Sequence, residues 1–126
     1  MITVAPITNQ EELLDFYNRK GLECKKNSGC AVAMFGSECL GYCTYELEKD
    51  KITVTSLSPT NDIMMADGIL RSALHIADAR GITKAYYFVE QNTEKVLEKL
   101  KFIADKQDKT LRIEKLHESC CGCNEK

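Results

Sequence analysis

The sequence contains no tryptophan, only two prolines in 126 residues, and no excess of charge of either sign. Its 17 Lys and Arg residues against 19 Asp and Glu residues give a formal net charge of −2, which provides no basic patch for nucleic acid or an anionic membrane. No apolar run approaches the ~20 residues that span a bilayer. Residues 1–6 lack the basic region and apolar stretch of a signal peptide. We therefore expect a cytoplasmic protein with neither nucleic-acid nor membrane partners.

What the sequence does have is the composition of a globular domain. Hydrophobic residues make up 44% and charged residues 29%, which excludes wholesale disorder. The length suffices for one hydrophobic core but not for two. There are seven cysteines, and an odd number without an export signal favours reduced thiols over a disulfide framework. Those of the first third are expected as small apolar residues in and around a hairpin: Cys24, Cys30, Cys39 and Cys43.

The first half of the chain predicts a strand, a helix and a three-stranded meander. A short strand over residues 2–6 precedes Asn9 and Glu12, whose spacing is that of a capping box at the start of a helix. Gly21 provides the left-handed residue that ends such a helix. Three strand-like segments follow, over residues 30–35, 39–47 and 52–57, and short connections between them favour antiparallel pairing.

The second half predicts two more helices and two more strands. Asn61 or Asp62 caps a helix with a wide apolar stripe, as a helix packed on a sheet requires. Residues 85–89 are too apolar for an edge strand. Asn92 or Thr93 then opens a helix with Val96, Leu97, Leu100 and Ile103 facing inward, and residues 110–116 alternate like a last strand.

This order, β-α-β-β-β-α-β-α-β, predicts an α/β (α+β) fold with a mixed, mostly antiparallel sheet and helices on its faces. The strand–helix–strand unit over residues 52–89 should be a right-handed crossover that joins parallel strands. We expect a single domain over residues 1–116, followed by a cysteine-rich tail over residues 117–126.

Three stretches resemble the GNAT superfamily of acyl-CoA-dependent N-acetyltransferases. The hairpin over residues 31–35 and 40–43 is similar to the family's second and third strands. Residues 57–59, 68–70 and 77–82 are similar to its fourth strand and cofactor helix. Val89-Glu90-Gln91-Asn92, followed by residues 97–102, is similar to its late asparagine and last helix. The resemblance implies transfer of an acetyl or other acyl group from acyl-CoA, such as acetyl-CoA, to an amine acceptor that the sequence does not identify.

The resemblance also implies which residues form the site. The backbone of Ser56, Leu57 and Ser58 would pair with the pantetheine arm. The stretch facing the pyrophosphate would comprise Ile63, Met64, Met65, Ala66, Asp67 and Gly68, and Asn92 would belong to the same cofactor site. Glu90, directly after the fifth strand, is the carboxylate nearest to the expected place of a catalytic base.

Several departures from the family pattern argue against strong activity. The family usually shows an Arg/Gln-x-x-Gly-x-Gly/Ala loop, whereas residues 62–67 here are Asp-Ile-Met-Met-Ala-Asp. Both glycines are absent, and Asp62 and Asp67 add negative charge where a helix N-terminus would hold phosphates. Leu97 stands where the family often has a proton-donating tyrosine. Residues 52–58, the fourth-strand segment, contain no carboxylate that could act as the general base. One helix precedes the hairpin where the family usually has two. We expect weak acyl-CoA affinity, and whether the protein is an enzyme stays open.

The tail places one imidazole and three thiols close together in His117, Cys120, Cys121 and Cys123. The tail has three possible roles at this stage. Imidazole and thiolate ligands suit zinc or copper(I), and exposed thiols also suit redox exchange. The third alternative is a terminus that binds no ligand. The alternative to an acetyltransferase is therefore a catalytically degenerate protein of the same fold, whose tail binds metal or senses thiol redox state. A homo-oligomer is compatible with the sequence, which does not define the oligomeric state.

Overall fold

The computed structural model describes residues 1–117, which form a seven-stranded sheet with the strand order β1-β2-β3-β4-β5-β7-β6. The strands are β1 (Ile2–Pro6), β2 (Ser28–Phe35), β3 (Glu38–Leu47), β4 (Lys51–Ser58), β5 (Lys84–Tyr87), β6 (Ile103–Asp105) and β7 (Thr110–Leu111). The helices are α1 (Gln10–Arg19), α2 (Ile63–Ala79), α3 (Gln91–Lys99) and the short 3₁₀ helix η1 (Ile113–His117). Strands β4 and β5 pair in parallel and the other neighbouring strands pair antiparallel, so the predicted mixed sheet is confirmed.

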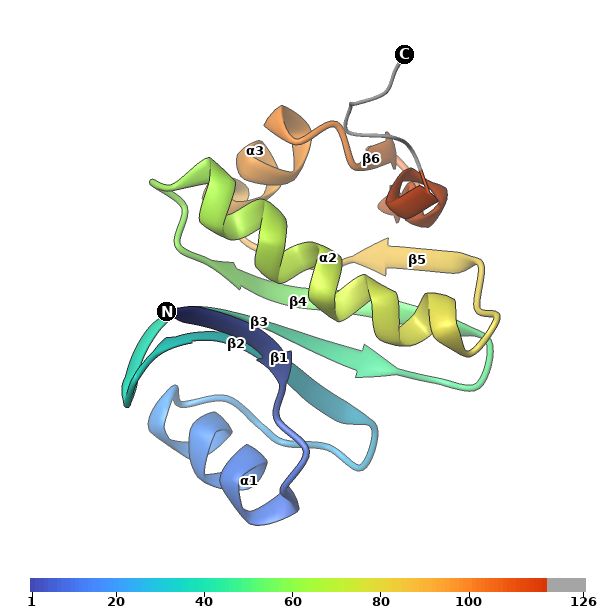
Figure 1. Cartoon of the computed structure of the whole chain (residues 1–126). Helices are drawn as coiled ribbons and strands as arrows, with labels where there is room; N and C mark the ends of the chain where they lie inside the picture. Colours follow the sequence, from blue (N-terminus) through green and yellow to red (C-terminus); the bar gives the residue numbers. More distant parts are fainter. Residues whose placement is uncertain (118–126) are drawn as a thin grey trace.

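Helix α1 covers one face of the sheet (Figure 1). Half of the predicted capping box is present: the Asn9 side chain accepts a hydrogen bond from the Glu12 N–H at 3.1 Å, whereas within residues 1–117 the Glu12 side chain makes no return bond to the Asn9 N–H. The helix ends as predicted, since Gly21 adopts φ +69° in the left-handed region. The buried side of α1, with Phe16 and Tyr17, packs against Cys30 of β2 and the half-buried Tyr42 of β3.

Helices α2 and α3 pack on the opposite face and enclose the larger core (Figure 1). The Asp62 carboxylate caps α2 by accepting the Met65 N–H at 3.1 Å, as expected. The apolar stripe of α2 is buried throughout: Ala66, Ile69, Leu70, Ala73, Leu74 and Ala77. Each fully buried Leu or Ile contributes about 1.5–3 kcal/mol, so this stripe fixes α2 on the sheet.

The end of the chain differs from its prediction. Helix α3 begins at Gln91, not at Asn92 or Thr93, and it ends at Lys99, before Leu100 and Ile103. Lys101 adopts φ +63°, which a continuing helix does not allow, and Ile103 instead begins β6. The strand predicted over residues 110–116 is also wrong beyond Leu111, where the chain turns into η1.

The four cysteines of the first third are free, and their environments differ. Cys30 and Cys43 are fully buried, as expected of small apolar residues, and burial raises the pKa of the Cys30 thiol to about 12. Cys24 is half-buried. Cys39 is exposed, so the expectation of an apolar environment is wrong for this residue.

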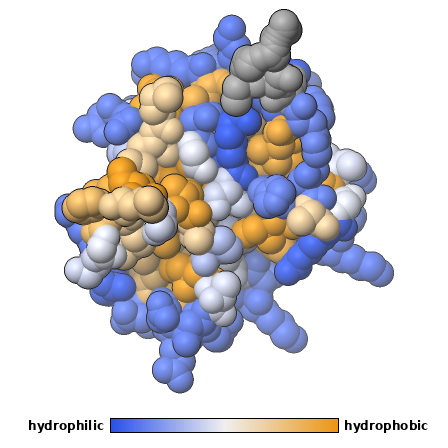
Figure 2. Space-filling model, viewed as in Figure 1, coloured by the Kyte–Doolittle hydropathy of each residue, from blue (hydrophilic) through white to orange (hydrophobic). Residues whose placement is uncertain are grey.

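Part of the surface is apolar. The exposed hydrophobic side chains include Met1, Ile2, Phe35 and Met64. Figure 2 shows apolar surface gathered on the side of the molecule where Figure 1 places the N-terminus and the beginning of α2. None of the helices within residues 1–117 is long and apolar enough to cross a membrane.

Candidate functional site

The candidate site is a cleft that opens where β4 and β5 separate. The two strands pair from Lys51 opposite Lys84 to Val54 opposite Tyr87. One further hydrogen bond joins them, from the Phe88 N–H to the Val54 carbonyl at 2.8 Å. Within residues 1–117 the pairing ends there, whereas β4 continues to Ser58. The second half of β4 therefore presents one strand edge to the cleft.

A bulge in β4 accounts for this separation. Thr44 of β3 pairs with Ser56, and the next residue, Tyr45, pairs with Val54, so Thr55 is an extra residue without a partner across the ladder. The buried Thr44 hydroxyl lies 2.8 Å from that of Thr55 and also hydrogen-bonds the Ser56 hydroxyl. A bulge bends its strand and increases its twist, which turns the end of β4 away from β5.

The cleft contains a cavity of about 390 Å³ that several elements line together. Its walls are Thr55, Ser56, Leu57, Ser58 and Thr60 from β4 and the following loop, Tyr42 from β3, Lys20 and Leu22 after α1, and Glu90 and Thr93 from the start of α3. The four predicted residues Ser56, Leu57, Ser58 and Glu90 thus meet at one cavity.

Three titratable side chains line this cavity: Tyr42, Glu90 and Lys20. Burial raises the pKa of the Tyr42 phenol, and the nearby Cys30, Cys39 and Glu90 raise it further, so the phenol keeps its proton at neutral pH. Glu90 occupies the N-cap position of α3 without a side-chain capping bond, which leaves its exposed carboxylate available. The Lys20 ammonium lies 4.8 Å from the centre of the Tyr42 ring.

The beginning of α2 lies next in the chain after the β4 wall. Among the first N–H groups of this helix, that of Met65 donates to the Asp62 carboxylate and that of Ala66 to the Asp62 carbonyl. The N–H groups of Ile63 and Met64 have no hydrogen-bond partner within residues 1–117. A helix N-terminus with two free donors can bind an anion, although the Asp62 carboxylate competes with it.

Other predicted cofactor residues of α2 differ in what they offer a ligand. Asp67 forms an ion pair with Arg71 at 2.9 Å, so its charge is largely compensated within the helix. Met64 is exposed, Ala66 is fully buried, and a Cβ atom at Gly68 would meet no atom within 4 Å. The exposed Asn92 of α3 is absent from the cavity walls in the described part of the chain. The cofactor roles of these residues stay predictions.

Sequence reasoning missed Tyr42 and Lys20. Tyr42 could have been found from the predicted meander, because antiparallel pairing of β3 with β4 places Tyr42 directly opposite Ser58, a predicted cofactor residue. Lys20 follows α1, which covers the face of the sheet opposite α2 and α3, and no local pattern connects it to the cleft. Leu97 has no donor group and is fully buried in the core, so its position contributes nothing to the cleft.

The predicted metal ligands Cys120, Cys121 and Cys123 lie outside the described residues. His117 is described, and its Nε2 atom lies 2.9 Å from the Asp78 carboxylate. Within residues 1–117 no group of three or more His, Cys, Asp or Glu side chains could hold a metal ion. A zinc or copper(I) site at the tail stays a prediction.

No protein-family model matches the chain, and no curated protein matches it in sequence. Solved structures do match. A ribosomal-protein-alanine N-acetyltransferase from Brucella melitensis biovar Abortus 2308 superposes with a TM-score of 0.62 at 12% identity, over 83% of this chain and 94% of that chain. A predicted acetyltransferase with acetyl-CoA from Clostridium acetobutylicum superposes with a TM-score of 0.61 at 14% identity. The match covers 85% of this chain and 93% of that chain.

A GNAT-family acetyltransferase from Streptococcus pneumoniae TIGR4 is similar as well, with a TM-score of 0.52 at 17% identity, over 80% of this chain and 84% of that chain. Identities this low establish the fold and not the activity. The fold is that of the GNAT acetyltransferases, which confirms the fold that the sequence resemblance implied.

Proposed function

We propose that this protein binds an acyl-CoA in the cleft between β4 and β5 and transfers the acyl group to an amine. The observation that carries the proposal is the strand edge of residues 55–58, which pairs with no other strand on the β5 side within residues 1–117 and lies beside a cavity that Glu90 and Tyr42 also line. An extended strand edge suits the amide groups of a pantetheine arm, because it offers backbone donors and acceptors in a row. A solved structure of the same fold contains acetyl-CoA, which supports this class of substrate.

The residues of the cavity fit the chemistry of acyl transfer. The amine nitrogen attacks the thioester carbonyl carbon, an N–C bond forms and the C–S bond breaks, which yields an amide and free CoA. In the proposal, Glu90 accepts the proton that the amine loses, and the Tyr42 hydroxyl donates a proton to the departing sulfur. Proton return from Glu90 to the Tyr42 phenolate, through solvent, restores both groups. Tyr42 would thus replace the tyrosine that Leu97 cannot provide.

The N-terminus of α2 would hold the pyrophosphate through the N–H groups of Ile63 and Met64. The helix dipole favours an anion there by about 0.3–1 kcal/mol, and the exposed Asp62 carboxylate opposes it by a similar amount. We therefore expect an affinity weaker than that of a glycine-rich loop, and slow turnover. A protein that binds acyl-CoA without transferring it would support the degenerate alternative.

Calorimetric titration with acetyl-CoA, followed by assay of CoA release against a panel of amines, tests the proposal. Release is best measured by chromatography, because the seven cysteines of the protein would react with a thiol reagent. Glu90→Gln should lower kcat by about 100-fold. Tyr42→Phe should lower it by about tenfold and flatten the alkaline limb of the pH profile.

Glu38→Gln, on an exposed residue outside the cavity, is the matched control and should leave kcat unchanged. Absence of acetyl-CoA binding at millimolar concentration would exclude the proposal. Binding with normal turnover in both cavity variants would exclude the assigned roles.

A further inference from the structure

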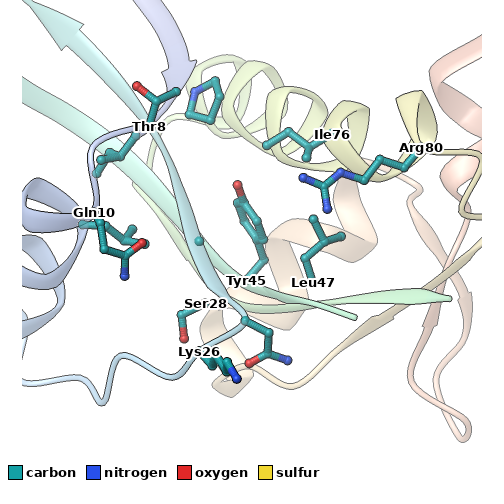
Figure 3. Close-up of a pocket in the computed structure, with 13 residues that line it drawn as sticks. Thr8, Gln10, Lys26, Ser28, Tyr45, Leu47, Ile76 and Arg80 are labelled. Atoms are coloured by element: carbon teal, nitrogen blue, oxygen red, sulfur yellow. The ribbon is translucent and has the colours of Figure 1, made fainter. Parts of the chain in front are cut away.

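A second cavity lies away from the acyl-CoA cleft, at the other end of α2. Its volume is about 400 Å³, and it lies between the connection from β1 to α1, the beginning of β2 and the C-terminal end of α2 (Figure 3). Helix α2 begins beside the cleft and is about 25 Å long, and Arg80 of this cavity follows its last residue. The two cavities share no lining residue.

Tyr45 brings into this cavity a hydroxyl that has no hydrogen-bond partner among residues 1–117. Its side chain is only 5% exposed, and Figure 3 shows the phenol oxygen pointing into the space between Thr8 and Ile76. The hydroxyl makes no hydrogen bond to any of residues 1–117, although the Tyr45 backbone carbonyl accepts one from Tyr17. Buried tyrosine hydroxyls normally have a partner, so this one points to a group that occupies the cavity.

The sequence makes room for this arrangement at Gly29. A Cβ atom there would lie 2.4 Å from Cε1 of the Tyr45 ring and 2.8 Å from its hydroxyl oxygen. Only glycine lets the ring lie this close to the backbone of β2. A side chain at this position would displace the Tyr45 ring and its hydroxyl from the cavity.

The charges around the cavity are of one sign. The Arg80 guanidinium reaches the part of the cavity that the Tyr45 hydroxyl faces (Figure 3). Lys26 lines the cavity beside Ser28. Neither cation forms an ion pair with another of residues 1–117, and no Asp or Glu lines the cavity. A phenol donor beside an unpaired guanidinium is a donor set for a carboxylate or a phosphate group.

Neutral polar residues, Thr8, Gln10 and Asn27, line part of the remaining wall, and another part is apolar. Leu13, Leu47 and Ile76 contribute side chains from α1, β3 and α2, respectively. A cavity of this size is at the lower end of the range for small-molecule sites. We propose that it binds a small organic anion, whose carboxylate or phosphate group contacts Tyr45 and Arg80 and whose apolar body lies against these three residues. This site is independent of the acyl-CoA cleft.

Titration of the ¹⁵N-labelled full chain with benzoate, phenyl phosphate and neutral benzyl alcohol tests this site by NMR. Both anions should give saturable shifts at the amides of Tyr45, Leu47 and Gln10, and benzyl alcohol should not. The stronger of the two anions identifies the preferred head group, and saturable binding of either one supports the proposal. The proposal would be overturned if neither anion gave saturable amide shifts up to about 20 mM, or if the neutral alcohol bound as tightly as the anions.

Two variants test the assigned contacts. Arg80→Gln, on an exposed residue, should weaken anion binding by about tenfold or more. Tyr45→Phe should weaken it by about fivefold and leave the melting temperature unchanged or raised, because no described hydrogen bond is lost. Arg19→Gln, at an exposed arginine that pairs with Asp15, is the control and should bind as the parent does. Unchanged anion affinity in both cavity variants would refute the site.

Discussion

Replacing Asp62 by asparagine separates the two roles of this residue at the start of α2. The side-chain oxygen accepts the Met65 N–H at 3.1 Å, and an asparagine oxygen can accept the same bond. The substitution therefore keeps the cap and removes the negative charge. Because the N–H groups of Ile63 and Met64 are free among the described residues, the anion-binding end of the helix keeps its donors.

The expected gain in acyl-CoA affinity follows from Coulomb's law. A phosphate oxygen held by either free N–H would lie only about 5 Å from the Asp62 carboxylate, because both oxygens bind neighbouring N–H groups of one helical turn. Two unit charges at that distance repel by about 0.8 kcal/mol in water and about 3.3 kcal/mol at an effective dielectric constant of about 20. Asp62 is exposed, so a value near 1 kcal/mol is appropriate, which corresponds to about fivefold tighter binding. The lost interaction with the helix dipole should cost about 0.3–1 kcal/mol of stability.

Calorimetric titration with acetyl-CoA at low and at high salt measures this gain, which should shrink as salt screens the charge. Asp67→Asn is the matched control, because Arg71 already compensates that carboxylate at 2.9 Å. It should change the affinity less than Asp62→Asn does. An Asp62→Asn variant that binds no tighter at low salt, or an Asp67→Asn variant with the larger gain, would refute the electrostatic reasoning.

Three further predictions concern stability, pH dependence and thiol reactivity. Gly41→Ala should destabilise the fold by about 2 kcal/mol or more in urea unfolding, because its Cβ would lie 2.5 Å from the Ser58 carbonyl oxygen. Gly68→Ala, in an open helical position, should instead stabilise by about 0.5–1 kcal/mol, and equal losses in both would contradict this account. The Tyr87 hydroxyl, at 2.7 Å, and then Lys109 lower the pKa of Glu94, so this carboxylate stabilises the fold above its unfolded pKa and loses that contribution as pH falls through the folded value. Tyr87→Phe should raise the pKa of Glu94 toward its ordinary value in an NMR titration, and an unchanged pKa would show that the bond has no effect. Exposed Cys39 should react with maleimide faster than the buried cysteines of β2 and β3, with or without zinc, whereas zinc should slow labelling of the tail cysteines if the tail is a metal site.

Local patterns in the sequence were sufficient to predict the main helices and strands and their order along the chain. Asn9 and Asp62 cap α1 and α2 as predicted, because capping depends on residues only three positions apart. The apolar stripe of α2 and the alternation in β4 follow periods of 3.6 and 2 residues, which any one segment displays by itself. The helix between β4 and β5 is a crossover connection, which allows the two strands to pair in parallel as predicted.

Short, non-local elements could not be predicted in the same way. Strands β6 and β7 contain three and two residues, too few for a periodic pattern, and they exist because they pair with each other and with β5. The same limit applies to the end of α3, where Lys101 turns the chain toward β6.

The candidate sites depend on contacts between distant segments, which only the tertiary structure decides. Glu90, Ser56 and Ser58 follow from the resemblance, but Tyr42 enters the cleft because the bulge at Thr55 shifts the register of β4. Asp67 looks like a repulsive charge in the sequence and is compensated by Arg71 in the helix. Tyr45 and Arg80, 35 residues apart in the chain, line one cavity only because β3 and the end of α2 pack together. Caps and periodicities are properties of one segment, whereas a cavity, its charge and its unpaired donors arise when several segments exclude water together.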